Sequence, residues 1–412
     1  MNLIRLFALV FCLILLSGCA SFGDSRRCGI TGKSFEGLSP LVKDSANTTK
    51  VMMVHGVGKH EPGYATQLLK GLAEEMGLNH ISENEKNISL NHPTTPGKEF
   101  GNLRVRRLTN EDKSHKLVFY ELTWSSLNDG QKAILAYDMS GDYSFDRAFL
   151  NEKIKRVTND FIPDQMLYVG EARKDILISF KQAFCAMVSR KWDDLPITST
   201  EACSPSDLLD AVDVMQNEHY AFISHSLGSR IVIDGLQSIA KGMEESRKNE
   251  AKISDGEEKV DIQGFRRTFR QLHIPIFMLA NQLPLFQITR GIPEITGQRK
   301  AYCRVDGEYY NLRTLSETDI IAFSDPNDIL SYTITNDFMR RYIDSRICYQ
   351  TTNININVAE IGGIFGITYA NPLAAHSGYH TDKRVLALIA NGVGNENTSP
   401  IVEESCKIMI TN

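Results

Sequence analysis

Residues 224–228, Ser-His-Ser-Leu-Gly, constrain the fold of this chain more than any other stretch. The apolar run 220–223 before them has the composition of a buried strand, and the apolar spacing of residues 231–236 after them favours a helix. Small residues at both ends of the five allow a sharp turn to close between strand and helix. A strand, a turn and a helix in this order raise the middle serine, Ser226, above a sheet edge, with the helix N-terminus behind its hydroxyl group. We therefore expect this hydroxyl to be exposed.

Continuous apolar runs elsewhere predict an α/β protein, because such runs are typical of strands buried on both faces of a sheet. They lie at residues 50–54, 117–122, 220–223, 274–279, 319–323 and 354–358. Since helical segments separate most of them, we expect a mostly parallel central sheet with helices on both faces. Residues 103–106 predict a further strand, in a hairpin at a sheet edge, and the polar stretch before them predicts a loop.

Strand signals fade between residues 125 and 203, where segments with helical periodicity replace them. Apolar side chains recur on one helical face at Ile176, Phe180, Phe184 and Met187. We expect residues 125–203 to form a helical insertion. Its apolar stripe has two interpretations, because such a face belongs either to the protein core or to a surface that meets a ligand.

The chain carries acid and base candidates downstream of the serine. A serine hydroxyl is a weak nucleophile at neutral pH, so it requires a base within hydrogen-bond reach and a third group that orients the base. Two aspartates, Asp325 and Asp328, directly follow the apolar run 319–323, and two histidines, His376 and His380, lie nearer the C-terminus. Each also has an ordinary interpretation, since aspartate before proline starts turns and histidines are common in surface loops.

A His-Gly pair follows the first predicted strand, in the sequence His55-Gly56-Val57-Gly58. His60 lies close to it in the chain, which raises the alternative of a metal site. No helical His-x-x-x-His pair with a carboxylate accompanies these histidines, so we expect no metal ion.

These features together resemble the α/β-hydrolase superfamily, and within it lipase-like and esterase-like serine hydrolases. The match covers residues 50–412 and consists of strand-His-Gly, strand-small-x-Ser-x-Gly-helix, strand-Asp and loop-His. The family's serine occupies a nucleophile elbow of the form Gly-x-Ser-x-Gly, in which Ser224 here replaces the first glycine. The resemblance implies an α/β-hydrolase fold, in which the insertion 125–203 forms a cap over the active site.

The resemblance also implies a role for each candidate residue. Ser226 is the expected nucleophile, since the family's order is serine, then acid, then histidine. Asp328 is the preferred acid, because the family's acid lies some residues beyond its strand, and Asp325 is the alternative. His376 resembles the family's late histidine, in a loop before the final helix, and His380 is the alternative base.

The main-chain amides of Val57 and Leu227 are the expected oxyanion-hole donors in this resemblance. The activity implied is hydrolysis of carboxylic esters through an acyl-enzyme, without a metal or an organic cofactor. Two alternatives remain: an acyltransferase that uses the same serine, and a non-catalytic envelope lipoprotein with a hydrolase-like fold.

The first residues resemble the signal peptide of a bacterial lipoprotein. The apolar run 6–16 is too short to span a bilayer and ends in Leu-Ser-Gly-Cys, which is similar to a lipobox. The resemblance implies removal of residues 1–18 and a lipid on Cys19, which anchors the protein to a membrane. Ala20 at the second mature position implies the outer membrane, with the protein facing the periplasm. The alternative is an ordinary secretory signal with an incidental cysteine.

The mature chain is acidic. Removal of Arg5 with the signal peptide leaves 44 basic residues against 50 acidic ones, a formal net charge of −6. This charge, without a basic run that contains aromatic residues, argues against nucleic acid. The expected partners are an ester or lipid substrate and the membrane, and no oligomeric state is predicted. We expect a tether over residues 19–47 and one folded domain over residues 48–412.

Six cysteines remain outside the signal peptide and the lipid site, and an even number in an exported protein favours disulfides. The preferred pairs are Cys28 with Cys406, Cys185 with Cys203, and Cys303 with Cys348. The first pair is expected because chain ends often lie close together, and the third pair takes the two cysteines that are left. Free buried thiols are the alternative.

Overall fold

The computed structural model describes residues 27–82, 84–135, 146–200, 203–250, 262–364 and 367–410. The expected signal peptide, residues 1–18, and the expected lipid site at Cys19 lie outside these ranges. Within them, no helix combines the length and the hydrophobicity that spanning a bilayer requires.

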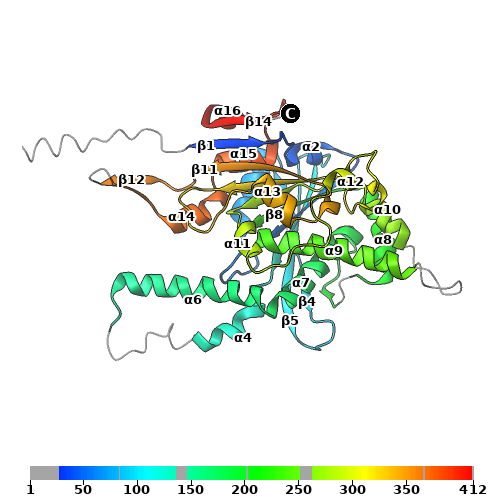
Figure 1. Ribbon diagram of the computed structural model, residues 1–412, viewed down its shortest axis with the longest axis horizontal. Coiled ribbons are helices and arrows are strands. Elements are labelled where there is room, and N and C mark those ends of the chain that lie inside the picture. Colours follow the sequence, from blue (N-terminus) through cyan, green and yellow to red (C-terminus); the bar gives the residue numbers. More distant parts are fainter. Residues whose placement is uncertain are drawn as a thin grey trace, which may run out of the picture.

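A mostly parallel sheet runs through the centre of the molecule (Figure 1). Eleven of its twelve strands follow the order β14-β1-β11-β10-β9-β8-β2-β6-β5-β4-β7, and β3 pairs with β5 outside this path. All pairings from β11 to β6 in that order are parallel, so the carboxyl ends of these strands lie at one edge of the sheet. The predicted α/β class with a mostly parallel central sheet is therefore confirmed.

The strands of this sheet are β1 (Cys28–Gly32), β2 (Thr48–Val54), β3 (His80–Ile81), β4 (Lys86–Asn91), β5 (Glu99–Thr109), β6 (Lys116–Thr123), β7 (Thr198–Ser199), β8 (Glu218–His225), β9 (Ile276–Leu279), β10 (Thr318–Ser324), β11 (Tyr349–Ile356) and β14 (Cys406–Ile410). A separate antiparallel hairpin consists of β12 (Ile361–Ile364) and β13 (Ile367–Ala370).

Helices cover both faces of the sheet, as β2 demonstrates. Met52 and Val54 belong to one buried cluster, whereas the alternate residues Val51 and Met53 belong to a second cluster. A strand whose alternate side chains are all buried requires a packed layer on each face. Buried residues of α7 and α9 belong to the first cluster, and buried residues of α15 and α16 belong to the second.

The longer helices are α3 (Thr66–Glu75), α6 (Phe149–Val169), α7 (Ala172–Ser189), α8 (Pro205–Gln216), α9 (Gly228–Glu250), α10 (Ile262–Phe269) and α15 (Lys383–Asn391). The shorter ones are α2 (Leu38–Lys43), α4 (Asp129–Lys132), α11 (Leu283–Gln287), α12 (Arg299–Cys303), α13 (Asn336–Tyr342), α14 (Pro372–Ser377) and α16 (Pro400–Ser405). Single 3₁₀ turns are η1 (Ser125–Asn128), η2 (Ala133–Leu135), η3 (Tyr310–Leu312), η4 (Ser345–Ile347) and η5 (Gly378–His380).

The expected tether is wrong for its second half. Strand β1 lies inside the sheet between β11 and β14, and α2 packs against the helix layer that contains α15. The apolar residues Ile30, Leu38 and Val42 of this segment are buried. They are few and lie among glycine and serine residues, so the sequence did not indicate a strand or a helix here. The folded domain therefore begins near residue 28 instead of residue 48.

Residues 103–106 form a strand as predicted, but this strand is not at an edge of the sheet. It belongs to β5, which pairs with β6 on one side and with β4 on the other. Strand β4 lies in the polar stretch that was expected to be a loop, and only Ile88 and Leu90 of this strand are buried. Two apolar residues at alternate positions are a weak signal, but they are sufficient where one face of a strand meets the core.

The helical insertion contains two long helices with different surroundings. On α7, the stripe of Ile176, Phe180, Phe184 and Met187 is buried in the core, which agrees with the core interpretation of these residues. On α6, the apolar residues Phe149 and Met166 are exposed. Figure 1 shows α6 projecting from the body of the molecule.

All three preferred disulfide pairs are present. Cys28–Cys406 joins β1 to β14, Cys185–Cys203 joins α7 to the segment before α8, and Cys303–Cys348 joins α12 to the start of β11. The first bond connects the two ends of the folded domain across neighbouring strands.

Candidate active site

The turn after β8 has the backbone of a nucleophile elbow. Ser226 has a φ angle of 56°, a left-handed conformation that few non-glycine residues adopt. Its N–H group donates a hydrogen bond to the carbonyl of Leu279 at 2.8 Å. Two residues on, a Cβ atom at Gly228 would overlap the carbonyl oxygen of Val54. Glycine is thus required where α9 begins against β2, as the five-residue pattern predicts.

Ser224 fits the position that glycine usually occupies. Its side chain is buried, and its hydroxyl lies 3.4 Å from Ser229 Oγ and 3.5 Å from the carbonyl oxygen of Phe277. The hydroxyl therefore has weak partners in α9 and β9, and the turn accommodates a serine at this position.

Ser226 differs from the expectation in its exposure. The residue is 0% exposed, and its hydroxyl has no hydrogen-bond partner in the described part of the chain. The His-Gly turn covers it, because a Cβ atom at Gly56 would lie 3.0 Å from Ser226 Oγ. The expectation of an exposed hydroxyl is therefore wrong, because neighbouring residues enclose Ser226.

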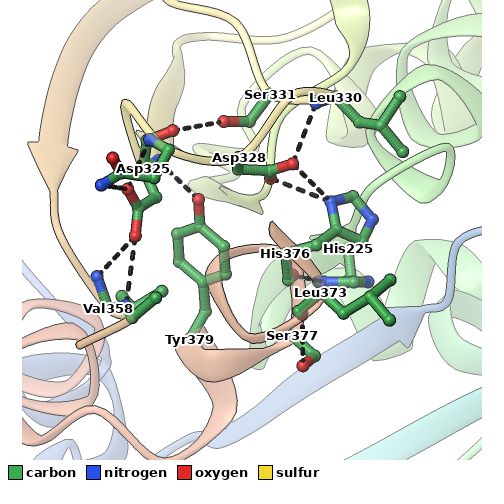
Figure 2. A network of polar contacts seen from close by, with 12 residues as sticks. His225, Asp325, Asp328, Leu330, Ser331, Val358, Leu373, His376, Ser377 and Tyr379 are labelled. Carbon is green, nitrogen blue, oxygen red and sulfur yellow. Dashed lines mark hydrogen bonds and ion pairs between the residues drawn. The ribbon is translucent and has the colours of Figure 1, made fainter. Parts of the chain in front are cut away.

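An acid and a base form a buried pair beside the elbow. Figure 2 shows the ring of His376 directed at the carboxylate of Asp328, with His376 Nδ1 2.9 and 3.0 Å from the two oxygens. The N–H group of Leu330 also donates to Asp328 at 2.9 Å. A neutral histidine that donates through Nδ1 presents Nε2 as an acceptor. This Nε2 atom is buried and has no partner among the described residues, Ser226 included.

The carboxylate of the other acid candidate, Asp325, is occupied by hydrogen bonds to the main chain. Its carboxylate accepts hydrogen bonds from the main-chain N–H groups of Asn327, Val358 and Ala359 (Figure 2). These bonds connect the turn after β10 to the segment after β11. Of the two aspartates, Asp328 is the one that contacts His376.

His225, the residue between the two serines, supports the base through its main chain. Its Nε2 atom lies 2.7 Å from the carbonyl oxygen of His376. Burial, followed by the nearby rings of His376 and His380, lowers the pKa of His225 well below its usual value, so the ring is neutral and donates this bond. Sequence reasoning did not assign His225 a role, although its place inside the motif was a signal.

The alternative base, His380, lies one turn beyond His376 in η5. Its ring centroid is 5.1 Å from that of His225, and its Nε2 atom is buried without a partner within the described ranges. Burial, with the charges of His60 and His376, lowers the pKa of His380 to about 4. The ring is therefore neutral at physiological pH and does not contact Asp328. His376 itself lies in the short helix α14, whereas a loop was expected.

The His-Gly turn lies at the same sheet edge as the elbow. The N–H groups of Val57 and Leu227 donate no hydrogen bond to any residue that the structure describes. Both residues are buried. Leu227 directly follows Ser226, and Val57 directly follows Gly56, which packs against the Ser226 side chain. An oxyanion hole requires free main-chain donors of this kind.

Asp164 on α6 holds this turn, and sequence reasoning missed it. Its buried carboxylate accepts a hydrogen bond from the N–H group of Gly58 at 2.7 Å and another from Asn128 Nδ2 at 2.8 Å. Lys132 Nζ forms an ion pair with it at 2.9 Å. A buried carboxylate is costly unless it is paired in this way. The expected insertion is thus connected directly to the turn beside Ser226.

Both ring nitrogens of His55 have hydrogen-bond partners. Its Nε2 atom accepts a hydrogen bond from the N–H group of Trp124 at 3.1 Å, and its Nδ1 atom is 2.8 Å from the carbonyl of Gly56. Its ring also stacks on Trp124 with centroids 4.7 Å apart. Within the described ranges, no three His, Cys, Asp or Glu side chains are grouped so as to hold a metal ion.

The site therefore gathers residues from three strand ends and one helix. The His-Gly turn follows β2, Ser226 follows β8, Asp328 follows β10, and His376 lies in α14, after the β12–β13 hairpin. Parallel strands bring these ends to one edge, at which ligands of open α/β sheets bind. No protein-family model matches the chain, nor does any curated protein or solved structure with which it was compared.

Proposed function

We propose that this protein is a serine hydrolase of the α/β-hydrolase type that cleaves carboxylic esters. The observation that carries the proposal is the Asp328–His376 pair, whose Nε2 atom is unoccupied, next to a serine in a left-handed turn at the end of a central strand. This combination matches what an activated serine requires: a base, a group that orients the base, and a backbone that presents the hydroxyl.

The proposed reaction follows from the tautomer of His376. Its Nε2 atom takes the proton of Ser226 as the hydroxyl oxygen attacks the ester carbonyl, and Asp328 stabilises the imidazolium that forms. The tetrahedral oxyanion accepts hydrogen bonds from the Val57 and Leu227 amides. Its collapse breaks the ester bond, and His376 returns the proton to the leaving alcohol. Water, deprotonated by the same histidine, then releases the acid from the acyl-enzyme.

Ser226 Oγ and His376 Nε2 are not hydrogen-bonded to each other in the structure. Catalytic hydrogen bonds are often long in ligand-free proteins and tighten when substrate binds. Because Ser226 is fully enclosed, an ester must also displace some of the residues around it. The connection of α6 to the His-Gly turn through Asp164 makes this helix the element through which such a movement would reach the site.

Apolar residues beside the acid and the base support an ester with an apolar acyl group. Ile329, next to Asp328, is 75% exposed, and Leu373, one turn before His376, is 48% exposed. Burial of such side chains against an acyl chain would remove apolar surface from water, which favours lipid-like esters over small polar ones.

We also propose that the protein is an outer-membrane lipoprotein that faces the periplasm, anchored through Cys19. Three disulfides in the folded domain support an oxidising compartment. The proposal is tested by metabolic labelling with a fatty-acid analogue, which should mark the wild-type chain and not a Cys19→Ala variant.

The activity is tested with a fluorophosphonate probe, which reacts with activated serines. The wild type should be labelled and should hydrolyse acyl esters, whereas Ser226→Ala should do neither. The matched control is Ser377→Ala, since Ser377 is an exposed serine near the site whose hydroxyl donates a hydrogen bond to the Leu373 carbonyl. Labelling that persists in Ser226→Ala, or its absence from the wild type, would contradict the proposal. Recovery of the acyl group on another lipid instead of as free acid would favour acyl transfer.

A further inference from the structure

A cavity of about 300 Å³ lies at the far end of α9 from the candidate active site. Residues 240–247 of this helix line one wall, and α10 and the segment after η3 line the others. At about 1.5 Å of rise per helical residue, this wall is roughly 20–30 Å from Ser226. The cavity is therefore separate from the proposed site of ester cleavage.

Arginine dominates the lining of this cavity. The six arginines are Arg247, Arg266, Arg267, Arg270, Arg313 and Arg346. Among the described residues that line it, Glu244 is the single carboxylate, and it is bound to Arg247 at 2.7 Å. Arg346 is paired with Asp344 at 2.6 Å. In the described part of the chain, these two ion pairs compensate the charges of Arg247 and Arg346.

Three of the arginines have no carboxylate within 4 Å in the part of the chain that the structure describes. They are Arg267, Arg270 and Arg313. The Nε atom of Arg270 is buried and has no hydrogen-bond partner there. Burial, and then the charges of Arg313, Arg266 and Arg267, lowers the pKa of Arg270. These guanidinium groups are therefore close enough to repel one another.

Arg313 is already fixed in position. Its side chain is buried, donates a hydrogen bond to the carbonyl of Tyr310 at 2.8 Å, and lies 3.7 Å above the Tyr310 ring. The disulfide Cys303–Cys348 joins the segment that precedes η3 to the one that follows η4. The Arg313 side chain is thus held by a hydrogen bond and by stacking, so it has little entropy left to lose when an anion binds.

We propose that this cavity binds the phosphate group of a phosphate ester. A dianion among these arginines would compensate the repulsion and accept charge-assisted hydrogen bonds from several guanidinium groups. A cavity of about 300 Å³ admits one such group, and its arginines surround the ligand from three segments of the chain. The proposal does not depend on ester hydrolysis at Ser226.

Calorimetric titration of the full chain tests the proposal. Inorganic phosphate and short-chain dihexanoyl phosphatidic acid are the two ligands, with potassium chloride at equal ionic strength as the blank. The variant is Arg267→Gln with Arg270→Gln, and we expect it to bind both ligands at least tenfold more weakly. The matched control is Arg340→Gln with Arg341→Gln, two exposed arginines of α13 outside the cavity.

Both ligands should bind the wild type and the control variant. Phosphatidic acid that binds at least tenfold more tightly than inorganic phosphate would identify a lipid headgroup as the source of the phosphate, and equal affinities would identify a soluble phosphate ester. A wild type that binds neither ligand would overturn the proposal. So would equal weakening in the cavity variant and the control variant.

Thermal unfolding separates loss of binding from loss of folding. Without phosphate, the cavity variant should unfold at the wild-type temperature or above it, because the substitutions remove like charges that repel. Added phosphate should then raise the unfolding temperature of the wild type but not that of the variant. A variant that unfolds well below the wild type without phosphate would contradict the argument from repulsion.

Discussion

Replacement of Asp164 by alanine should slow the proposed reaction without touching any reacting atom. Asp164 contacts the site only through the N–H group of Gly58, one residue beyond the expected oxyanion donor Val57. Alanine removes this acceptor and also leaves Lys132 without its closest partner. The turn then lacks the contact that fixes it against α6, so the Val57 amide is less well directed at the developing oxyanion.

The size of the effect has two bounds. Complete loss of one oxyanion donor costs about 2.7–4 kcal/mol of transition-state stabilisation, or roughly 100- to 1,000-fold in kcat. The hydrogen bond from Gly58 to a charged acceptor contributes about 1.5–3 kcal/mol, and this energy limits how firmly the turn is held. We therefore expect kcat to fall roughly 10- to 100-fold in Asp164→Ala, with a smaller change in KM because the donor acts mainly in the transition state.

Steady-state hydrolysis of an acyl ester, combined with the rate of fluorophosphonate labelling, measures this effect. Asp160→Asn is the matched control, because Asp160 lies on the same helix and pairs with Lys132 at 3.4 Å but has no hydrogen bond to Gly58. Thermal unfolding of both variants shows whether the fold is retained. The reasoning is refuted if Asp164→Ala keeps kcat within twofold of the wild type, or if Asp160→Asn slows the reaction as much.

Three further predictions concern single side chains. Asp328→Asn should lower kcat roughly 10,000-fold by disturbing the histidine tautomer, whereas Asp325→Asn should keep fluorophosphonate labelling and lose about 1–3 kcal/mol of stability in urea unfolding because three N–H groups lose a charged acceptor. Gly228→Ala should destabilise the fold by about 1–3 kcal/mol because its Cβ atom meets the Val54 carbonyl, and Ser224→Ala by no more than about 1 kcal/mol because its hydrogen bonds are long. The folded-state pKa of His380, about 4, lies below its ordinary value of 6.5, so the unfolded chain binds more protons between these values. The resulting contribution of about 3 kcal/mol is present above pH 6.5 and is lost as the pH falls through about 4, and in urea unfolding the loss of stability over this range should be smaller by about that amount in His380→Asn than in the wild type.

The sequence predicted the centre of the sheet because its strands are buried on both faces. Strands β2 and β10 each contain four consecutive buried apolar residues, 51–54 and 320–323, and such a run is visible without knowledge of what packs against it. Strands β1 and β4 have fewer buried apolar residues, and their places depend on pairing with distant strands. A local pattern does not contain this information.

The sequence indicated which residues could form the candidate site, but it did not indicate which of them are in contact or how they are enclosed. Asp325 and Asp328 lie in one short turn, and the choice between them depends on which carboxylate faces a histidine 48 residues away from Asp328. The enclosure of Ser226 depends on Gly56, from a different strand end. Asp164 carried no local signal, because its role comes from a contact with Gly58 106 residues away.

The direction of β1 places the proposed lipid anchor relative to the site. Because β1 runs antiparallel to β11, its first residue, Cys28, pairs with Ile356 at the carboxyl end of β11, which is the edge that also carries Ser226. Eight residues separate Cys19 from Cys28, and a fully extended chain of that length reaches about 30 Å. An acyl chain on Cys19 would therefore hold the serine-bearing edge close to the bilayer. The anchor would then favour lipids of the protein's own leaflet as substrates, because they would encounter the serine far more often than esters free in solution.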